Sequence, residues 1–327
     1  MRLIRIPLIE LGSEGPLALL RQDRGRATAL IASARRTYGA LPFALADRLS
    51  RGWLARSDNP YRAEIAAIAD ELGTGAALLN LSYEWGCTTG AFAGVDGRPR
   101  LVRVLDWPLD GLGANVVVAR RTTQAGPLVD VTWPGATGVV TALAPGRFAV
   151  AMNQAPRTRH GLGFVGDWLV NRVALLARSR DIPPMHLLRR ACESAESFAH
   201  ARAVLSVSPI AVPAIFILAG TQPGECCVIE RREHDARVHD AVPAIAANAW
   251  LSGWPGVARG DTNAERSAAL AACGAAAGAD FAWLQPPMLN WQTRLAVVAS
   301  AATGEAAVVG IEGERAATEV LEVGPST

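Results

Sequence analysis

The stretch Trp85-Gly86-Cys87-Thr88-Thr89-Gly90 lies where the pattern of apolar residues changes from helical to extended. Over residues 1–86, leucine, isoleucine and alanine recur at the three- and four-residue spacing of amphipathic helices. Beyond it, short β-rich runs with a hairpin-turn signal at Asp96-Gly97 predict strands. The sequence therefore predicts a helical N-terminal segment, residues 1–86, followed by a strand-rich domain, residues 87–327.

Cys87 has the chemical neighbours that a catalytic thiol needs. Arg103 and Asp106 follow it on the second predicted strand. A thiol attacks as the thiolate, and its usual pKa near 8.5 means that it needs a cation or a base. If the chain is cut between Gly86 and Cys87, the new α-amino group, with a pKa of about 7.7–8.0, becomes that base. Arg103 would then stabilise the thiolate and Asp106 would hold the amine, unless Arg103 merely pairs with a nearby carboxylate.

Two asparagines are candidates for stabilising the oxyanion of an amide-cleaving reaction. Asn153 and Asn248 each end a predicted strand, so the plain alternative is that both are turn residues. Residues three apart on a regular strand face opposite ways. We therefore expect Arg103 and Asp106 to converge only if their strand ends or bulges near Trp107-Pro108.

The order of the predicted elements favours one architecture. Strands come first, then helices, strands, a helix and a closing hairpin, which predicts two sheets packed face to face with helices outside. The residues after Val320 are expected to fray. The predicted strands are 88–95, 101–105, 114–119, 128–133, 138–142, 147–152, 214–219, 226–230, 244–249, 295–301 and 306–311, and the predicted helices of this region are 168–177, 185–192, 197–205 and 263–276.

Composition narrows the classes of function. The net charge of the 327 residues is only +2, and the chain contains no lysine, so no nucleic-acid or membrane binding is expected from bulk electrostatics. The sequence contains no run of about 18 uncharged apolar residues, so no transmembrane helix is expected. The five cysteines form no disulfide or zinc pattern, so we expect no metal, no cofactor and a cytoplasmic location. The oligomeric state is left open.

Five segments, in order, resemble the N-terminal-nucleophile hydrolases that cleave linear amides. The resemblance is nearest to acid ceramidase and N-acylethanolamine acid amidase, and more distant to choloylglycine hydrolases and the penicillin-forming (isopenicillin-N) acyltransferases. It spans most of the chain, which makes it more specific than any single motif. The matching segments are Asn80-Leu81-Ser82-Tyr83-Glu84, Cys87-Thr88-Thr89, Arg103-Val104-Leu105-Asp106-Trp107, residues 135–153 and residues 213–231.

The resemblance implies a role for each matching residue. Cys87 would be the nucleophile, Arg103 and Asp106 its supports, Asn248 a side-chain oxyanion donor, and the backbone near Asn153 a second donor. Arg266 would be the late arginine of the site, with Arg259 as a weaker candidate. Trp85, Trp107 and Gln154 are the candidates for lining a substrate pocket. Gln154 stands where ceramidase-like enzymes have glutamate, and Gly86 is an unusual residue before the bond that is cut.

The implied activity is hydrolysis of a non-peptide N-acyl amide through an acyl-thioester, after self-cleavage at Gly86-Cys87 of an inactive precursor. Residues 1–86 would stay bound after the cut. Two alternatives remain open. The first is an acyltransferase on the same scaffold, in which an amine replaces water. The second is an acyl-ligand binding protein that is never processed.

Overall fold

The structure, a computed structural model, describes residues 3–81, 86–163, 166–167, 170–171 and 179–325. Its larger sheet has eight strands. The first two neighbours in this sheet are parallel and all the others are antiparallel. In spatial order the strands are β1 (Leu8–Gly12), β4 (Val117–Thr123), β5 (Gly126–Thr132), β6 (Thr141–Ala144), β7 (Phe148–Gln154), β8 (Ala214–Ala219), β9 (Cys226–Arg231) and β10 (Ala236–Asp240).

The second sheet has seven strands, and all its pairs are antiparallel. Its first long strand begins at Gly86, directly at the predicted cleavage site. In spatial order the strands are β11 (Ala244–Ala246), β2 (Gly86–Ala93), β3 (Pro99–Asp106), β12 (Thr293–Ser300), β13 (Glu305–Glu312) and β14 (Arg315–Ala316), with β15 (Leu321–Val323) also paired to β13.

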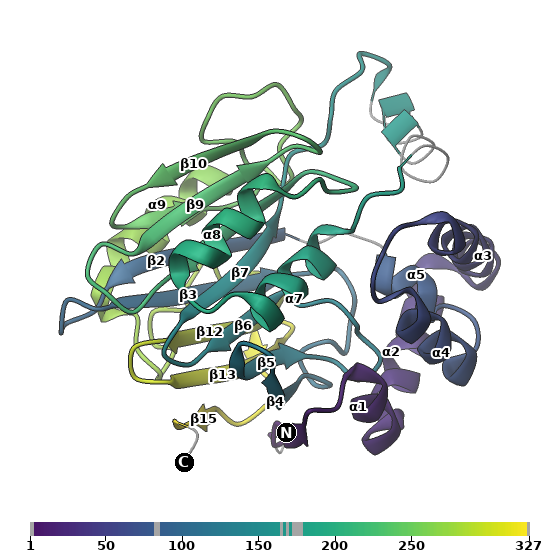
Figure 1. Ribbon diagram of the computed structural model, residues 1–327, viewed down its shortest axis with the longest axis horizontal. Helices are drawn as coiled ribbons and strands as arrows, with labels where there is room; N and C mark the ends of the chain where they lie inside the picture. The colour runs from purple at the N-terminus through teal and green to yellow at the C-terminus, as the bar shows by residue number, and fades with distance from the viewer. Residues whose placement is uncertain (1–2, 82–85, 164–165, 168–169, 172–178, 326–327) are drawn as a thin grey trace.

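The two sheets pack face to face, and helices cover their outer faces (Figure 1). β2 and β3 lie against β7 and β8. On the outside, α7 (Pro184–Ser194) and α8 (Phe198–Val207) pack on the larger sheet. On the other side, α9 (Asn263–Cys273), followed by the 3₁₀ turn η1 (Gly274–Ala276), packs on β2 and β11. The predicted α+β sandwich, with layers in the order αββα, is confirmed.

Burial explains the composition of the central strands. Every residue of β7 and of β8 is buried, because one face meets the other sheet and the opposite face meets helices. Strands covered on both faces carry continuous apolar runs rather than alternating ones. Phe216-Ile217-Leu218 in β8 is such a run. The two polar residues of β7 are therefore buried: Asn153 is hydrogen-bonded to Thr89, whereas the side chain of Gln154 has no hydrogen-bond partner.

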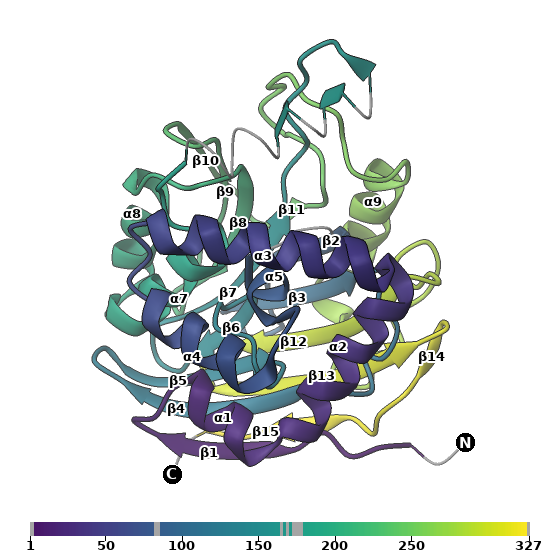
Figure 2. The same cartoon turned by 90° about the vertical axis from the view of Figure 1, so that its right-hand side faces the viewer.

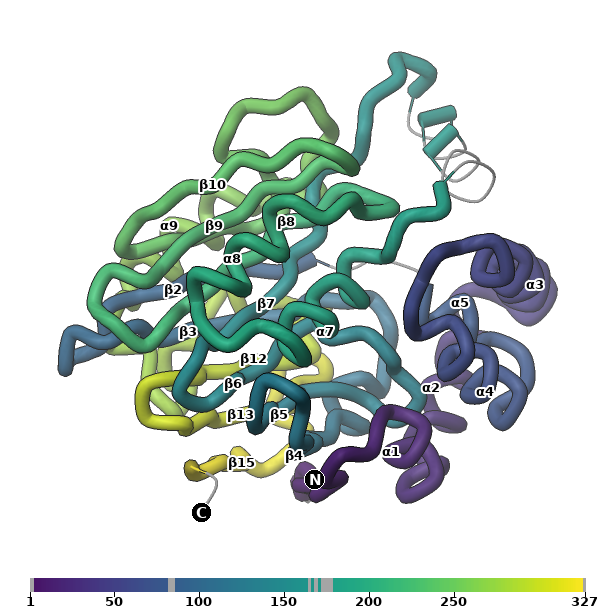
Figure 3. Tube along the Cα trace, in the orientation of Figure 1, coloured from purple at the N-terminus to yellow at the C-terminus, as the bar shows by residue number. Residues whose placement is uncertain are grey.

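The N-terminal helices gather at one side of the sandwich, as Figures 1 and 3 show from one direction and Figure 2 from another. Some of their buried residues, including Leu20, Leu30 and Ile68, join the same core cluster as the sheets. None of the described helices is both long and apolar enough to cross a membrane. These helices are α1 (Pro16–Gln22), α2 (Arg24–Tyr38), α3 (Ala40–Arg56), α4 (Arg62–Leu72) and α5 (Ala76–Leu81).

Several elements differ from the sequence-based expectations. β1 is a strand inside the segment that we expected to be helical, and it pairs with β4. β10 was not predicted, because its alternation is weak and its side chains are mostly exposed. The tail expected to fray contains β15, which pairs with β13. The helix predicted over residues 168–177 falls almost entirely outside the described residues.

Candidate active site

The Cys87 thiol lies between the two sheets. The residue is fully buried in β2, with its Sγ 3.0 Å from Nη2 of Arg103 and 3.9 Å from the carbonyl oxygen of Met152 in β7. The β2–β3 register pairs Thr89 with Arg103, so their side chains share one face. Cys87 is two residues from Thr89 and points the same way. The hairpin register therefore brings the predicted cation to the predicted thiol.

The Cys87 thiol and its neighbours are buried from solvent. Arg103 is also fully buried, and its Nη1 donates to the carbonyl oxygen of Val140 at 2.8 Å. Burial raises the pKa of the Cys87 thiol to about 11, although the nearby Arg103 cation lowers it. In this structure Cys87 is therefore a neutral thiol at pH 7. It becomes a nucleophile only when a base takes its proton.

Asp106 lies on the opposite face of β3 from Arg103. Its Oδ2 is 2.7 Å from Nη1 of Arg266 in α9, and its Oδ1 accepts from the Thr293 hydroxyl at 2.9 Å. Burial raises the pKa of the Asp106 carboxyl, while Arg266 and these hydrogen bonds lower it. Arg103 and Asp106 do not converge, although β3 ends at Asp106. The strand pairing is irregular here, but the extra residue is Arg294 in β12, opposite the end of β3.

The backbone N–H of Cys87 faces a second set of polar groups. It donates to Oδ1 of Asn248 at 2.7 Å, and Nη2 of Arg266 donates to the same oxygen at 3.2 Å. Nδ2 of Asn248 donates to the carbonyl oxygen of Gln154 at 2.8 Å. Asp106, through Arg266, belongs to this set. Thus separate groups contact the thiol and the amide nitrogen of one residue: Arg103 at the sulfur, and Asn248, backed by Arg266, at the nitrogen.

The two predicted oxyanion residues are both buried beside Cys87. Asn153 accepts from the Thr89 hydroxyl at 2.7 Å and donates to the carbonyl oxygen of Ala246 at 2.9 Å, so it ties the sheets together. It lies within β7 and is not a plain turn residue. In the uncut chain both side-chain amides have protein partners. The oxyanion roles of Asn153 and Asn248 stay predictions.

Three polar residues of the site were missed by the sequence analysis. Asn263 accepts from the backbone N–H of Asn248 and from Arg266, at 2.9 and 3.0 Å. Thr293 binds Asp106, and Thr89 binds Asn153. Only Thr89 carried a usable signal, since it lies two residues after Cys87 on a predicted strand. Arg259 donates to the carbonyl oxygen of Ala155 at 2.9 Å.

The candidate pocket residues have different fates. Trp107 lines a small apolar cavity of about 80 Å³ between α2, α4 and α5 on one side and residues 132–140 on the other. Val140, whose carbonyl oxygen binds Arg103, also lines it. Gln154 is buried, and neither its amide nitrogen nor its oxygen has a hydrogen-bond partner in the structure. Trp85 lies outside the described residues.

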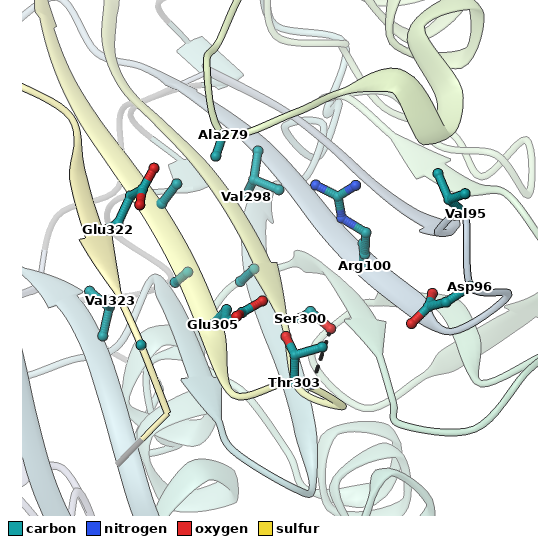
Figure 4. Close-up of a pocket in the computed structure, with 14 residues that line it drawn as sticks. Val95, Asp96, Arg100, Ala279, Val298, Ser300, Thr303, Glu305, Glu322 and Val323 are labelled. Carbon is teal, nitrogen blue, oxygen red and sulfur yellow. Dashed lines mark hydrogen bonds between the residues drawn. The ribbon is translucent and has the colours of Figure 1, made fainter. Parts of the chain in front are cut away.

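A larger hollow, about 500 Å³, is lined by none of the predicted site residues. It contains Arg100 from β3, Ser300 at the end of β12, and the carboxylates of Glu305 and Glu322 (Figure 4). Arg100 lies on the face of β3 that carries Asp106, away from the thiol. In the described part of the chain, no three His, Cys, Asp or Glu residues converge as possible metal ligands.

Comparisons with known proteins find related sequences and a related fold. Over 179 residues the chain is 30% identical to N-acylethanolamine-hydrolyzing acid amidase of Oryctolagus cuniculus, covering 53% of this chain and 48% of that protein. It is 27% identical over 209 residues to acid ceramidase of Balaenoptera acutorostrata scammoni, covering 57% and 51%. The chain thus spans about half the length of the curated relatives it matches. No protein-family model matches it.

Among solved structures, a Caenorhabditis elegans ortholog of N-acylethanolamine-hydrolyzing acid amidase superposes with a TM-score of 0.51. The two share 19% identity, and the match covers 66% of this chain and 93% of that chain. At this identity the likeness shows the fold. The resemblance read from the sequence is confirmed, and the chain has the αββα sandwich fold of the N-terminal-nucleophile hydrolases.

Proposed function

We propose that this protein is a cysteine N-terminal-nucleophile amidohydrolase that cuts its own chain between Gly86 and Cys87. One observation carries the proposal. The Sγ of Cys87 lies 3.0 Å from a buried arginine, Arg103, while its N–H donates to Asn248 at 2.7 Å. A structural cysteine needs an acceptor for its buried N–H but no arginine at its sulfur. An N-terminal nucleophile needs both, because its thiolate and its α-amine must each be held in place.

Self-cleavage uses the Cys87 thiol against the preceding peptide bond. The sulfur attacks the Gly86 carbonyl carbon, the C–S bond forms, and the C–N bond to Cys87 breaks. The thiol proton passes to the departing nitrogen, which becomes the α-amine. Water then hydrolyses the thioester, leaving a carboxylate on Gly86 and a free thiol on Cys87. No other reactant is required.

Turnover repeats this chemistry on an external amide. The α-amine of Cys87 takes the thiol proton, and the thiolate, stabilised by Arg103, attacks the substrate carbonyl. The protonated α-amine then gives its proton to the leaving amine. Water, losing a proton to the α-amine, hydrolyses the acyl-thioester to a carboxylic acid. Asn248 holds the α-amine through Oδ1, with Arg266 and Asp106 behind it, and we assign it the side-chain oxyanion role as well.

An apolar acyl group suits the surroundings of this site. The cavity lined by Trp107 and Val140 also takes Leu30 and Ile31 from α2 and Leu79 from α5. Burying the acyl chain of a substrate against these residues would stabilise binding by about 0.8 kcal/mol per methylene. We therefore propose a non-peptide N-acyl amide as substrate, with the N-terminal helices forming part of its binding site. The free cysteines also support a reducing, cytoplasmic location.

The mass of the purified protein tests the proposal. The wild-type chain should yield two fragments, one ending at Gly86 and the other beginning at Cys87. The Cys87→Ala variant should stay one chain of 34.4 kDa. The cut protein should then release acid from N-acyl amides in water. Transfer of the acyl group to an added amine, in preference to water, would identify an acyltransferase. A chain that stays uncut and turns over no amide would support the acyl-ligand binding alternative and refute the enzyme.

A further inference from the structure

One side chain fastens the helix that precedes the proposed cleavage site. Asn80, in α5, is buried and makes four hydrogen bonds. Its Oδ1 accepts from the backbone N–H of Thr137 at 2.7 Å and from the Thr137 hydroxyl at 2.8 Å. Its Nδ2 donates to the carbonyl oxygens of Gly135 at 2.8 Å and Ala76 at 2.9 Å. Two donors and two lone pairs are all that an amide side chain offers.

The loop that receives Asn80 also holds the cation beside the thiol. Three residues beyond Thr137, the carbonyl oxygen of Val140 accepts from Nη1 of Arg103 at 2.8 Å, and Nη2 of Arg103 donates to the Cys87 Sγ at 3.0 Å. Residues 135–140 therefore contact both the helix that precedes the proposed cleavage site, through Asn80, and the arginine beside the thiol that follows it, through Val140.

A neutral histidine, His186, is the next member of the hydrogen-bond network around Asn80 and Thr137. The Thr137 hydroxyl gives its proton to Asn80, so it accepts from Nε2–H of His186 at 2.8 Å. Nδ1 of His186 accepts from Nδ2 of Asn59 at 3.0 Å. Burial lowers the pKa of His186 to about 3, so the ring is neutral at pH 7 and has the one donor and one acceptor that this pattern uses. Asn59 comes from the N-terminal segment, and His186 from α7.

We propose that Asn80 is a positioning residue for self-cleavage, which places the Gly86–Cys87 peptide against the thiol by holding α5 on residues 135–140. The proposal rests on the proposed function. Asn80 lies 87 − 80 = 7 residues before Cys87, and none of its four bonds reaches Gly86 or Cys87. It therefore acts through the placement of the chain. Misplacing a reacting group by about 1 Å can slow a reaction roughly a hundredfold.

The test measures the first-order rate at which freshly translated precursor is cut. We expect Asn80→Ala and Thr137→Val to slow cleavage by roughly tenfold to a hundredfold. Thr137→Ser keeps the hydroxyl and should restore the rate. Tyr61→Phe is the matched control, because it removes another bond between the N-terminal segment and α7, from the Tyr61 hydroxyl to Glu193 at 2.8 Å. It should lower the Tm yet leave the cleavage rate unchanged.

The outcomes separate three cases. Rates are compared at equal distances below each variant's own Tm. If Thr137→Val and Asn80→Ala are cut at the wild-type rate, or if Tyr61→Phe slows cleavage as much as they do, Asn80 only stabilises the fold and the proposal is wrong. A wild-type chain that is never cut overturns self-cleavage itself. Should Asn80→Ala fail to fold, Thr137→Val with its Thr137→Ser rescue decides alone.

Discussion

The backbone N–H of Cys87 donates to the side-chain oxygen of Asn248 at 2.7 Å, across 161 residues of sequence. The same oxygen accepts from Arg266, which in turn pairs with Asp106. Asn248, Arg266 and Asp106 thus form the part of the site around the backbone nitrogen of Cys87, separate from the groups around its thiol. If the chain is cut as proposed, the N–H becomes an ammonium or amine group, and Asn248 would then orient the proposed general base.

Asn248 can be tested with two substitutions in protein already shown to be cut. Asn248→Ala should lower kcat by about a hundred- to a thousandfold, the usual result of losing an oxyanion donor, while KM changes little. Asn248→Asp keeps an oxygen towards Cys87 but loses the donor, so it should be slow as well. If Asn248→Asp turns over at the wild-type rate, holding the amine is its only role and the oxyanion donors lie elsewhere.

The Asp106–Arg266 pair should be strongly coupled. Both side chains are buried, and their charged atoms are 2.7 Å apart. Arg266→Met leaves Asp106 without its cation and should lower the free energy of unfolding by about 3–5 kcal/mol. In Asp106→Asn/Arg266→Met the loss should be smaller than the sum of the single losses. Urea unfolding of the four proteins, each with Cys87→Ala to prevent cleavage, measures the coupling, and strict additivity would show that the pair is not an interacting unit.

His186 should make the fold sensitive to acid. Its pKa is lowered by burial from 6.5 to about 3. A group with a lowered pKa contributes its full stability above the unfolded pKa and loses it as the pH falls towards the folded pKa. The free energy of unfolding should therefore fall by about 1.4 kcal/mol for each pH unit below 6.5.

His186→Gln cannot titrate and should lack this part of the pH dependence. Asp130 titrates in the opposite sense, because burial raises its pKa to about 7 and so favours the folded state at low pH. Comparing His186→Gln with wild type, each with Cys87→Ala, cancels that contribution. Parallel curves of unfolding free energy against pH from 7 to 5 would mean that His186 is protonated in the folded state.

The N-terminal segment should stay bound after cleavage. Apolar residues such as Leu20, Phe43 and Ile68 are buried in the same cluster as the sheets, and each is worth about 1.5–3 kcal/mol. β1 also pairs with β4, and Arg189 of α7 pairs with Glu64. Both fragments should elute together in gel filtration, even at 1 M salt, because apolar burial is not screened. Separation without denaturant would make residues 1–86 a disposable propeptide.

Part of this site follows from sequence alone. The turn at Asp96-Gly97 joins β2 and β3, and this pairing puts Thr89 opposite Arg103 and the Cys87 thiol on the same face. Such relationships are local, since the two-residue period of a strand and a tight turn determine them. The helical spacing before Cys87 is local in the same sense. The fold class and the candidate nucleophile could be predicted from these local features.

Only the tertiary structure decided the rest. Asn248 contacts Cys87, Arg266 contacts Asn248, and Val140 contacts Arg103. These residues come from separate segments, and no sequence spacing relates them to Cys87. β1 has only five residues, and its partner strand begins 117 − 8 = 109 residues later, so local pattern could not reveal it. The strand period already implies that Arg103 and Asp106 face opposite ways, but the groups that they meet, Val140 and Arg266, come from distant segments. Burial against distant segments selects those neighbours, because apolar contact has no direction and no preferred sequence separation.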